Sequence, residues 1–101
     1  AYSILFDVKN KKTLANYYDT LFSAVIEYDR INHSAMMRTL ETYLDNNARL
    51  SRTSKALFIH ENTLKYRLSR IQALMRVDIS SLQGQSCVLL GLQIGRMLNR
   101  Q

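Results

Sequence analysis

The chain has 101 residues, which is enough for one domain with its own hydrophobic core. Apolar residues make up 47% of it and charged residues 22%, as in ordinary soluble globular proteins, and the absence of Pro with only three Gly disfavours collagen, Pro-rich linkers and turn-dense β-sandwiches. No stretch approaches the roughly 18 apolar residues that cross a bilayer, and the N-terminus does not have the pattern of a signal peptide. We therefore expect a cytoplasmic, all-α chain without a membrane partner, folded as a compact bundle of about five helices.

The positive charge of the chain is concentrated in one short window. Residues 1–50 carry six basic and six acidic side chains, whereas residues 51–76 carry six basic side chains against Glu61 alone. Clustered Lys and Arg attract phosphates and release counterions when they neutralise them. An ordinary solvated basic face would give the same count. The charge of residues 51–76 therefore fits a polyanionic partner and also fits a solvated basic surface.

The N-terminal third predicts one amphipathic helix. Residues 2–8 are rich in β-branched and aromatic types and fit either a short strand or the frayed tail of an upstream element. The polar run at 9–12 predicts a loop. From 13 to 28 apolar residues recur three and four positions apart, which is the spacing of one helix face.

Two further helices are predicted from similar spacing and from capping residues. Ser34 is the expected N-cap of a helix over 35–46, which ends near Asn46 and Asn47, where Asn tolerates a left-handed cap. Ser80 or Ser81 is the expected N-cap of a last helix over about 82–98.

Between these helices the sequence predicts a helix-turn-helix. A short helix begins near Ser51, which can cap it, and a longer one covers about 61–75 with Leu64, Leu68, Ile71 and Met75 at steps of four, three and four. Such a pair presents its second helix to the major groove of DNA. We expect residues 1–33 to form an N-terminal segment that links to an upstream region or dimerises, and residues 34–101 to form the DNA-binding domain.

The polar side of the second helix is the candidate base-reading face. With Leu64 facing the core, a step of about 100° per residue turns the polar side chains away from the apolar stripe. Amide, amine and hydroxyl groups are the ones that recognise base edges. The residues that we expect to face bases are Asn62, Thr63, Lys65, Tyr66 and Ser69.

A second set of side chains is expected to contact phosphates. The start of the first helix offers hydroxyls, a cation and free backbone amides, a combination that suits an anion. His60 lies at the turn, where its ring either caps the second helix or meets a phosphate, and two arginines flank the base-reading face. The phosphate-facing residues are thus predicted to be Ser51, Arg52, Thr53, His60, Arg67 and Arg70.

Residues 36–98 resemble the C-terminal helix-turn-helix domain of the PucR-type regulators, which include bacterial activators of purine catabolism and sugar-diacid use. The most specific stretch is His-x-Asn-Thr-Leu-x-Tyr-Arg over residues 60–67. Further matching stretches are residues 39–47, 56–60, 70–71 and 77–79. The resemblance implies sequence-specific binding of double-stranded DNA in a transcriptional regulator, usually as a homodimer, with any small-molecule effector bound by a sensor region outside this chain.

The chain departs from the family pattern in three places. Glu61 stands where a basic residue is usual, and it either caps the recognition helix or accepts from a cytosine amino group. Ser54 stands at a position that is commonly Ala, where the two helices approach closely. Gly91 and Gly95 stand in a last helix that more often carries Ala or Leu, and this small-residue pair admits a neighbouring helix from this chain or from a second subunit.

Little in the sequence indicates a catalytic or metal-binding function. His33 and His60 have no second ligand at metal-binding spacing, and one cysteine, Cys87, cannot supply a multi-cysteine zinc site and is expected to be a small buried residue. Gly-rich phosphate loops and nucleophile elbows are absent from the sequence. We expect no metal, no cofactor and no enzymatic activity. The alternative function is a helical interaction module whose basic face docks an acidic protein; RNA binding is a weaker third reading, because only Tyr66 offers an exposed aromatic ring.

Overall fold

The structure is a computed structural model that describes residues 8–100. Within this range the chain forms five helices and no strand, which confirms the predicted all-α fold. The helices are α2 (Val8–Asn32), α3 (Met36–Asp45), α4 (Leu50–Leu57), α5 (Glu61–Met75) and α6 (Leu82–Met97).

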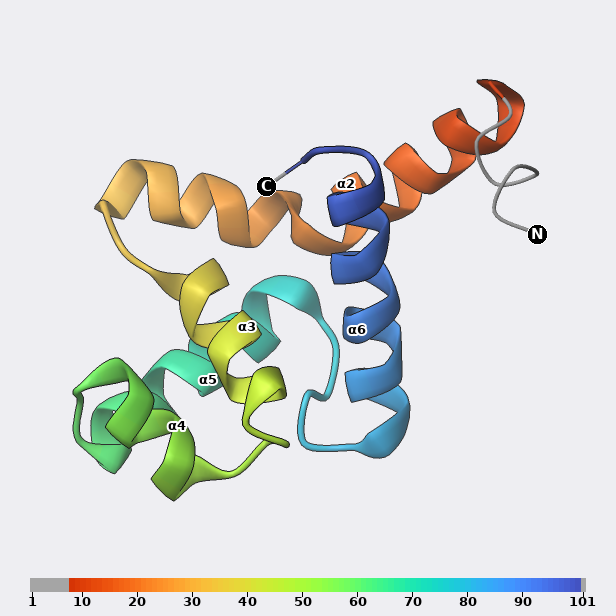
Figure 1. Ribbon diagram of the computed structural model, residues 1–101. Coiled ribbons are helices and arrows are strands. Elements are labelled where there is room, and N and C mark those ends of the chain that lie inside the picture. The colour runs from red at the N-terminus through yellow and green to blue at the C-terminus, as the bar shows by residue number, and fades with distance from the viewer. Residues whose placement is uncertain (1–7, 101) are drawn as a thin grey trace.

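The long helix α2 holds the other helices together. It packs against α3, α5 and α6, while α4 contacts only α3 and α5. In Figure 1 the first turns of α2 project beyond α6, and α3, α4 and α5 lie on one side of α2. This arrangement leaves the helix-turn-helix, α4 and α5, at the end of the molecule away from the projecting turns of α2.

Helix α2 is longer than the sequence predicts. The run at 9–12, expected to be a loop, is helical, so that prediction is wrong. It contains neither Gly nor Pro, and Lys is a good helix former. Of the stretch 2–8, only Val8 is among the described residues, and it begins α2.

One hydrophobic core joins these helices; α4 adds no fully buried apolar residue to it, but its Leu50 and Leu57 are partly buried and pack against it. Helix α2 contributes three fully or almost fully buried side chains to it, so the N-terminal segment and the helix-turn-helix domain share this core. The buried apolar residues are Tyr18, Phe22, Val25, Met36, Leu40, Tyr43, Leu64, Leu68, Ile71, Met75, Ile79, Val88, Leu92 and Ile94. The stripe expected on α5 is buried in full.

Two glycines let α2 and α6 approach closely. A Cβ atom built on Gly95 would lie 2.4 Å from Cε2 of Tyr18, and one built on Gly91 would lie 2.7 Å from Cδ2 of Leu21. The Tyr17 hydroxyl also donates a hydrogen bond of 3.0 Å to the Cys87 carbonyl oxygen across the same contact. The small-residue pair in α6 therefore accommodates a helix of this chain.

Helix α3 is capped from α2. Ser34 is not its N-cap; that position is Ala35, which has no side-chain capping bond. Instead the Asp29 carboxylate accepts bonds from the backbone N–H groups of Met36, at 2.7 Å, and Met37, at 2.9 Å. Ser34 Oγ donates to the same carboxylate at 2.6 Å. Asp29 thus fixes the end of α2 to the start of α3.

Replacing Asp29 by Ala is expected to lower the free energy of unfolding by about 1–2 kcal/mol, the usual cost of losing an N-cap. Chemical denaturation measures this loss. Asp45→Ala is the matched control, because Asp45 is exposed in the last turn of α3, where a negative charge opposes the helix dipole. Equal stabilities of the Asp29→Ala and Asp45→Ala proteins would contradict the assigned cap.

The other predicted caps have mixed outcomes. Ser81 is the N-cap of α6, and its hydroxyl oxygen accepts from the Gly84 N–H at 3.0 Å, as expected. Asn47 follows α3 with a left-handed φ of 57°, which confirms the expected turn there. Ser51 is not an N-cap, because α4 already begins at Leu50.

Candidate nucleic-acid interface

The turn between α4 and α5 is closed by two backbone hydrogen bonds. The Phe58 N–H donates to the Lys55 carbonyl at 3.2 Å, and the Ile59 N–H donates to the Ser54 carbonyl at 3.0 Å. Together with the left-handed φ of 57° at Phe58, these bonds form a Schellman motif. A left-handed backbone costs a residue other than Gly about 1–2 kcal/mol. The sharp reversal sets α5 across α4.

Helix α5 has one buried side and one open side. Its apolar stripe faces the core, and the five side chains predicted to read bases are all exposed: Asn62, Thr63, Lys65, Tyr66 and Ser69. Exposure of this whole set is what a base-reading role requires. The helical period explains this pattern, because it places the apolar stripe and the five polar side chains on opposite sides of α5.

Of the predicted phosphate-facing set, four residues are exposed, Arg67 is half-buried and Thr53 is buried. Ser51, Arg52, His60 and Arg70 are exposed. His60 is the N-cap residue of α5 but makes no side-chain capping bond, so its ring does not cap the helix. Glu61 is also exposed, in the first turn of α5, where its charge complements the helix dipole.

Thr53 does not belong to the phosphate-facing set. It is fully buried, and its Oγ1 donates to the Arg49 carbonyl oxygen at 2.7 Å. Ser54 is buried beside it, and its hydroxyl donates to the Ser51 carbonyl oxygen. Small hydroxyl residues whose polar atoms are satisfied within the helix let α4 pack closely on its neighbours α3 and α5. The prediction failed because it used the position of Thr53 at the start of α4 and not the side it faces.

Arg67 is also turned inward. It is half-buried, and its guanidinium donates a hydrogen bond of 3.2 Å to Oγ1 of Thr39, which is fully buried on α3. The Thr39 hydroxyl in turn donates to the Ala35 carbonyl oxygen. Arg67 therefore ties α5 to α3, and its predicted phosphate contact stays a prediction.

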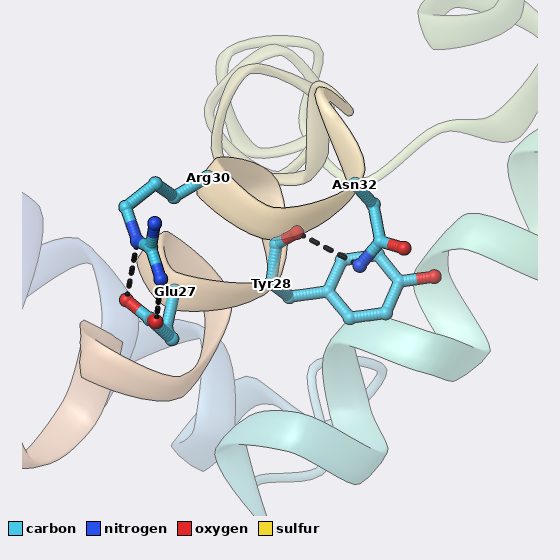
Figure 2. A network of polar contacts seen from close by, with 4 residues as sticks. All are labelled: Glu27, Tyr28, Arg30 and Asn32. Atoms are coloured by element: carbon cyan, nitrogen blue, oxygen red, sulfur yellow. Dashed lines mark hydrogen bonds and ion pairs between the residues drawn. The ribbon is translucent and has the colours of Figure 1, made fainter.

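Arg70 lies between two tyrosine rings. Its guanidinium carbon is 5.8 Å from the ring centroids of both Tyr66, on α5, and Tyr28, on α2. Its guanidinium also donates to the Tyr66 hydroxyl at 3.3 Å, and this bond is the main reason that the pKa of Arg70 is raised. Figure 2 shows the Tyr28 ring near the end of α2, where the Tyr28 carbonyl accepts from Asn32 Nδ2. Helix α2 thereby touches the exposed side of the predicted recognition helix.

Sequence reasoning did not single out Phe58 as a site residue. Its side chain is 94% exposed at the turn, next to Lys55 and His60. The signal in the sequence was a large apolar residue at a place where a helix C-cap usually has Gly.

The described residues contain neither a metal-binding cluster nor a membrane-spanning helix. Among residues 8–100 no three His, Cys, Asp or Glu side chains are grouped so that they could hold a metal ion. No helix in this range combines the length and the apolar character needed to span a bilayer. Cys87 is exposed, so the expectation that it is buried is wrong.

Comparison with known proteins identifies the family. The model of the PucR C-terminal helix-turn-helix domain matches residues 36–94, which extend from the start of α3 into the last turn of α6. The chain belongs to the PucR family. Residues 36–94 are therefore the DNA-binding helix-turn-helix domain of a bacterial transcriptional regulator, and the family is not one of enzymes.

Two relatives show how much of the chain is matched, and the match to the first of them extends over α2. The chain is 31% identical over 96 residues to the DNA-binding transcriptional activator AdeR of Bacillus subtilis, which covers 95% of this chain and 23% of AdeR. It is 40% identical over 63 residues to the carbohydrate diacid regulator of Escherichia coli, covering 62% of this chain and 16% of that protein. The chain thus spans less than a quarter of the length of these relatives.

A solved structure shows a similar fold. The regulator of polyketide synthase expression from Bifidobacterium adolescentis matches with a TM-score of 0.65 and 26% identity, over 94% of this chain and 37% of that one. Because the match covers nearly the whole chain, the packing of α2 on the PucR domain also has a counterpart in a solved structure.

Proposed function

We propose that this PucR domain reads a specific DNA sequence by laying the exposed side of α5 in the major groove. The observation that supports the proposal most strongly is the set of five exposed, hydrogen-bonding side chains opposite the buried stripe of α5. A helix of this kind fits the wide groove of B-form DNA, where each base pair has its own pattern of donors and acceptors. In this arrangement Asn62, Thr63, Lys65, Tyr66 and Ser69 face the bases.

The phosphate contacts in this proposal come from both helices. Ser51 and Arg52 lie at the exposed start of α4, and His60 and Arg70 lie beside the base-facing set. Arg52 and Arg70 supply positive charge, and all four side chains can donate hydrogen bonds to phosphate oxygens. Glu61 lies at the groove end of α5, where its carboxylate accepts from a cytosine amino group.

Selection of bound duplexes from a random DNA pool tests this proposal. We expect one short motif to be enriched, present twice in inverted orientation with centres about 10–11 base pairs, or a multiple of that, apart. Enrichment of no motif, together with capture of acidic proteins in preference to DNA, would instead support the alternative interaction module.

We further infer that the domain binds DNA as a homodimer through the outer face of α6. That face carries Leu82, which is 81% exposed, and Leu90, which is 54% exposed, with Leu89 beside them. A step of about 100° per residue places these three on one side of α6, opposite Gly91 and Gly95, which face α2. Burial of this leucine face in a twofold contact would remove an exposed apolar patch from water.

Charged substitutions on α6 test the dimer. The Leu82→Asp and Leu90→Asp double variant is expected to sediment as a monomer at concentrations where the unaltered chain is dimeric, and to bind one half-site. Asp19→Ala on α2 is a control that should leave the mass unchanged. Retention of the dimer by the leucine double variant would rule out this surface.

The remaining parts of the regulator lie outside this chain in our proposal. Residues 34–101 act as the DNA-binding unit. Residues 1–33, which include α2, join this unit to a sensor region that binds any small-molecule effector. The bacterial cytoplasm, which holds the chromosome, is the compartment in which such a regulator works.

A further inference from the structure

Among the described residues, Phe58 is the large apolar residue with the highest exposed fraction. It is 94% exposed, whereas its neighbours Leu57 and Ile59 are partly buried and pack against the core. The Phe58 ring therefore projects from the turn while the residues on either side point inward.

The backbone at this position gives Phe58 no advantage within the fold. Its φ of 57° is left-handed, a conformation that Gly adopts freely and an aromatic residue does not. The Schellman bonds of the turn use only backbone atoms, so they would form equally well with Gly. Neither packing nor local geometry in the described part of the chain benefits from a Phe side chain here.

The surroundings of the ring are basic and belong to the proposed interface. Phe58 lines a shallow hollow of about 380 Å³ with Ser54, Lys55, Ile59 and His60. The one acidic side chain near it in the sequence is Glu61, at the first position of α5. An acidic protein partner would meet the charge of Lys55, but that charge suits the phosphates of DNA equally, and His60 is the N-cap residue of the helix proposed to enter the groove.

Chain length places Phe58 at the same half-site as the base-reading residues. Asn62 lies four positions further along the chain, so the Cα atoms of the two residues are at most about 14 Å apart. This corresponds to roughly four base-pair steps of 3.4 Å. A phenyl ring can neither donate nor accept a conventional hydrogen bond, and the apolar group that the major groove offers is the C5-methyl group of thymine.

We propose that Phe58 packs against the methyl group of a thymine within about five base pairs of the pair read by Asn62. The inference rests on the proposed function, because it requires α5 to enter the major groove. It adds an apolar contact from the turn to the polar contacts of α5, and so makes Phe58 a specificity-determining residue.

Deoxyuridine substitution tests this contact, because it removes the methyl group and nothing else. In a site selected by the unaltered chain, each thymine is replaced in turn and the dissociation constant is measured. We expect about a fourfold loss at one thymine of each half-site, the effect of one buried methyl group. Phe58→Gly should bind the thymine site about tenfold more weakly and show no further loss at that position.

The variants separate this inference from the proposed function and from misfolding. Phe58→Gly and Phe58→Asn should unfold at the same temperature as the unaltered chain or higher, since both residues tolerate the left-handed backbone. Ile31→Ala, at an exposed apolar residue of α2, is the matched control and should leave affinity unchanged.

Three results would overturn the contact. They are full affinity in Phe58→Gly, unchanged sensitivity of that variant to deoxyuridine, and a loss that is equal on all sequences. In each case selection of a motif by the unaltered chain would leave the proposed function standing. Failure of the unaltered chain to select any motif would remove the proposed function, and this contact with it.

Discussion

Replacing Gly95 by Ala should lower the free energy of unfolding by about 1–3 kcal/mol, the usual cost of overpacking a core. The added Cβ would lie 2.4, 3.0 and 3.3 Å from three ring atoms of Tyr18, which is almost completely buried and is packed against Phe22 with ring centroids 4.9 Å apart. The ring has little room to move, so α2 and α6 must separate. Thermal or chemical unfolding measures the effect.

The sign of this change is what tests the packing of α2 on α6. In open space a change from Gly to Ala within a helix stabilises a protein by up to about 1 kcal/mol. Gln93→Ala, at an exposed position of the same helix, is the control and should be neutral or slightly stabilising. Stabilisation by Gly95→Ala would mean that α2 does not cross α6 at this glycine.

Lys65→Ala should lower the affinity for the selected DNA site by about 10- to 100-fold, the effect of losing one good base contact. It should weaken binding to unrelated DNA much less, so that the sequence preference at one position is relaxed. Arg52→Ala should instead weaken binding to all sequences to a similar degree and reduce the salt slope by about one. Titrations of both variants at several salt concentrations give these quantities.

The contrast between the two variants is the informative result. Lys12→Ala is the matched control, because Lys12 is an exposed cation on α2, outside the helix-turn-helix. It should change neither the preference nor the affinity. Equal losses on specific and unrelated DNA for Lys65→Ala would move Lys65 from the base-facing to the phosphate-facing set.

The sequence was sufficient to predict features that depend on a single helix. The limits of α5 and its buried stripe were predicted because its apolar residues follow the helical period without interruption. Once Leu64 is known to face the core, the exposure of Lys65 and Asn62 follows from geometry alone. Ser81 was found as a cap because its partner, Gly84, is three residues away.

Contacts between helices were not predictable in the same way. Thr53 and Arg67 were expected to contact phosphates, but the neighbouring helices cover Thr53, and Arg67 has a partner, Thr39, that is 28 residues away in the chain. Asp29 caps α3 from seven and eight residues upstream, across a turn whose course the sequence does not specify. Only the packing of α2, α3, α4 and α5 on one another decides these positions.

Methylation interference on a selected DNA site is the most direct test of the claim that α5 lies in the major groove. Methyl groups are placed on guanine N7, in the major groove, and on adenine N3, in the minor groove, and the DNA that still binds is analysed. Guanine methylation should block binding within each half-site, and adenine methylation should not. Interference by adenine methylation alone would contradict the account.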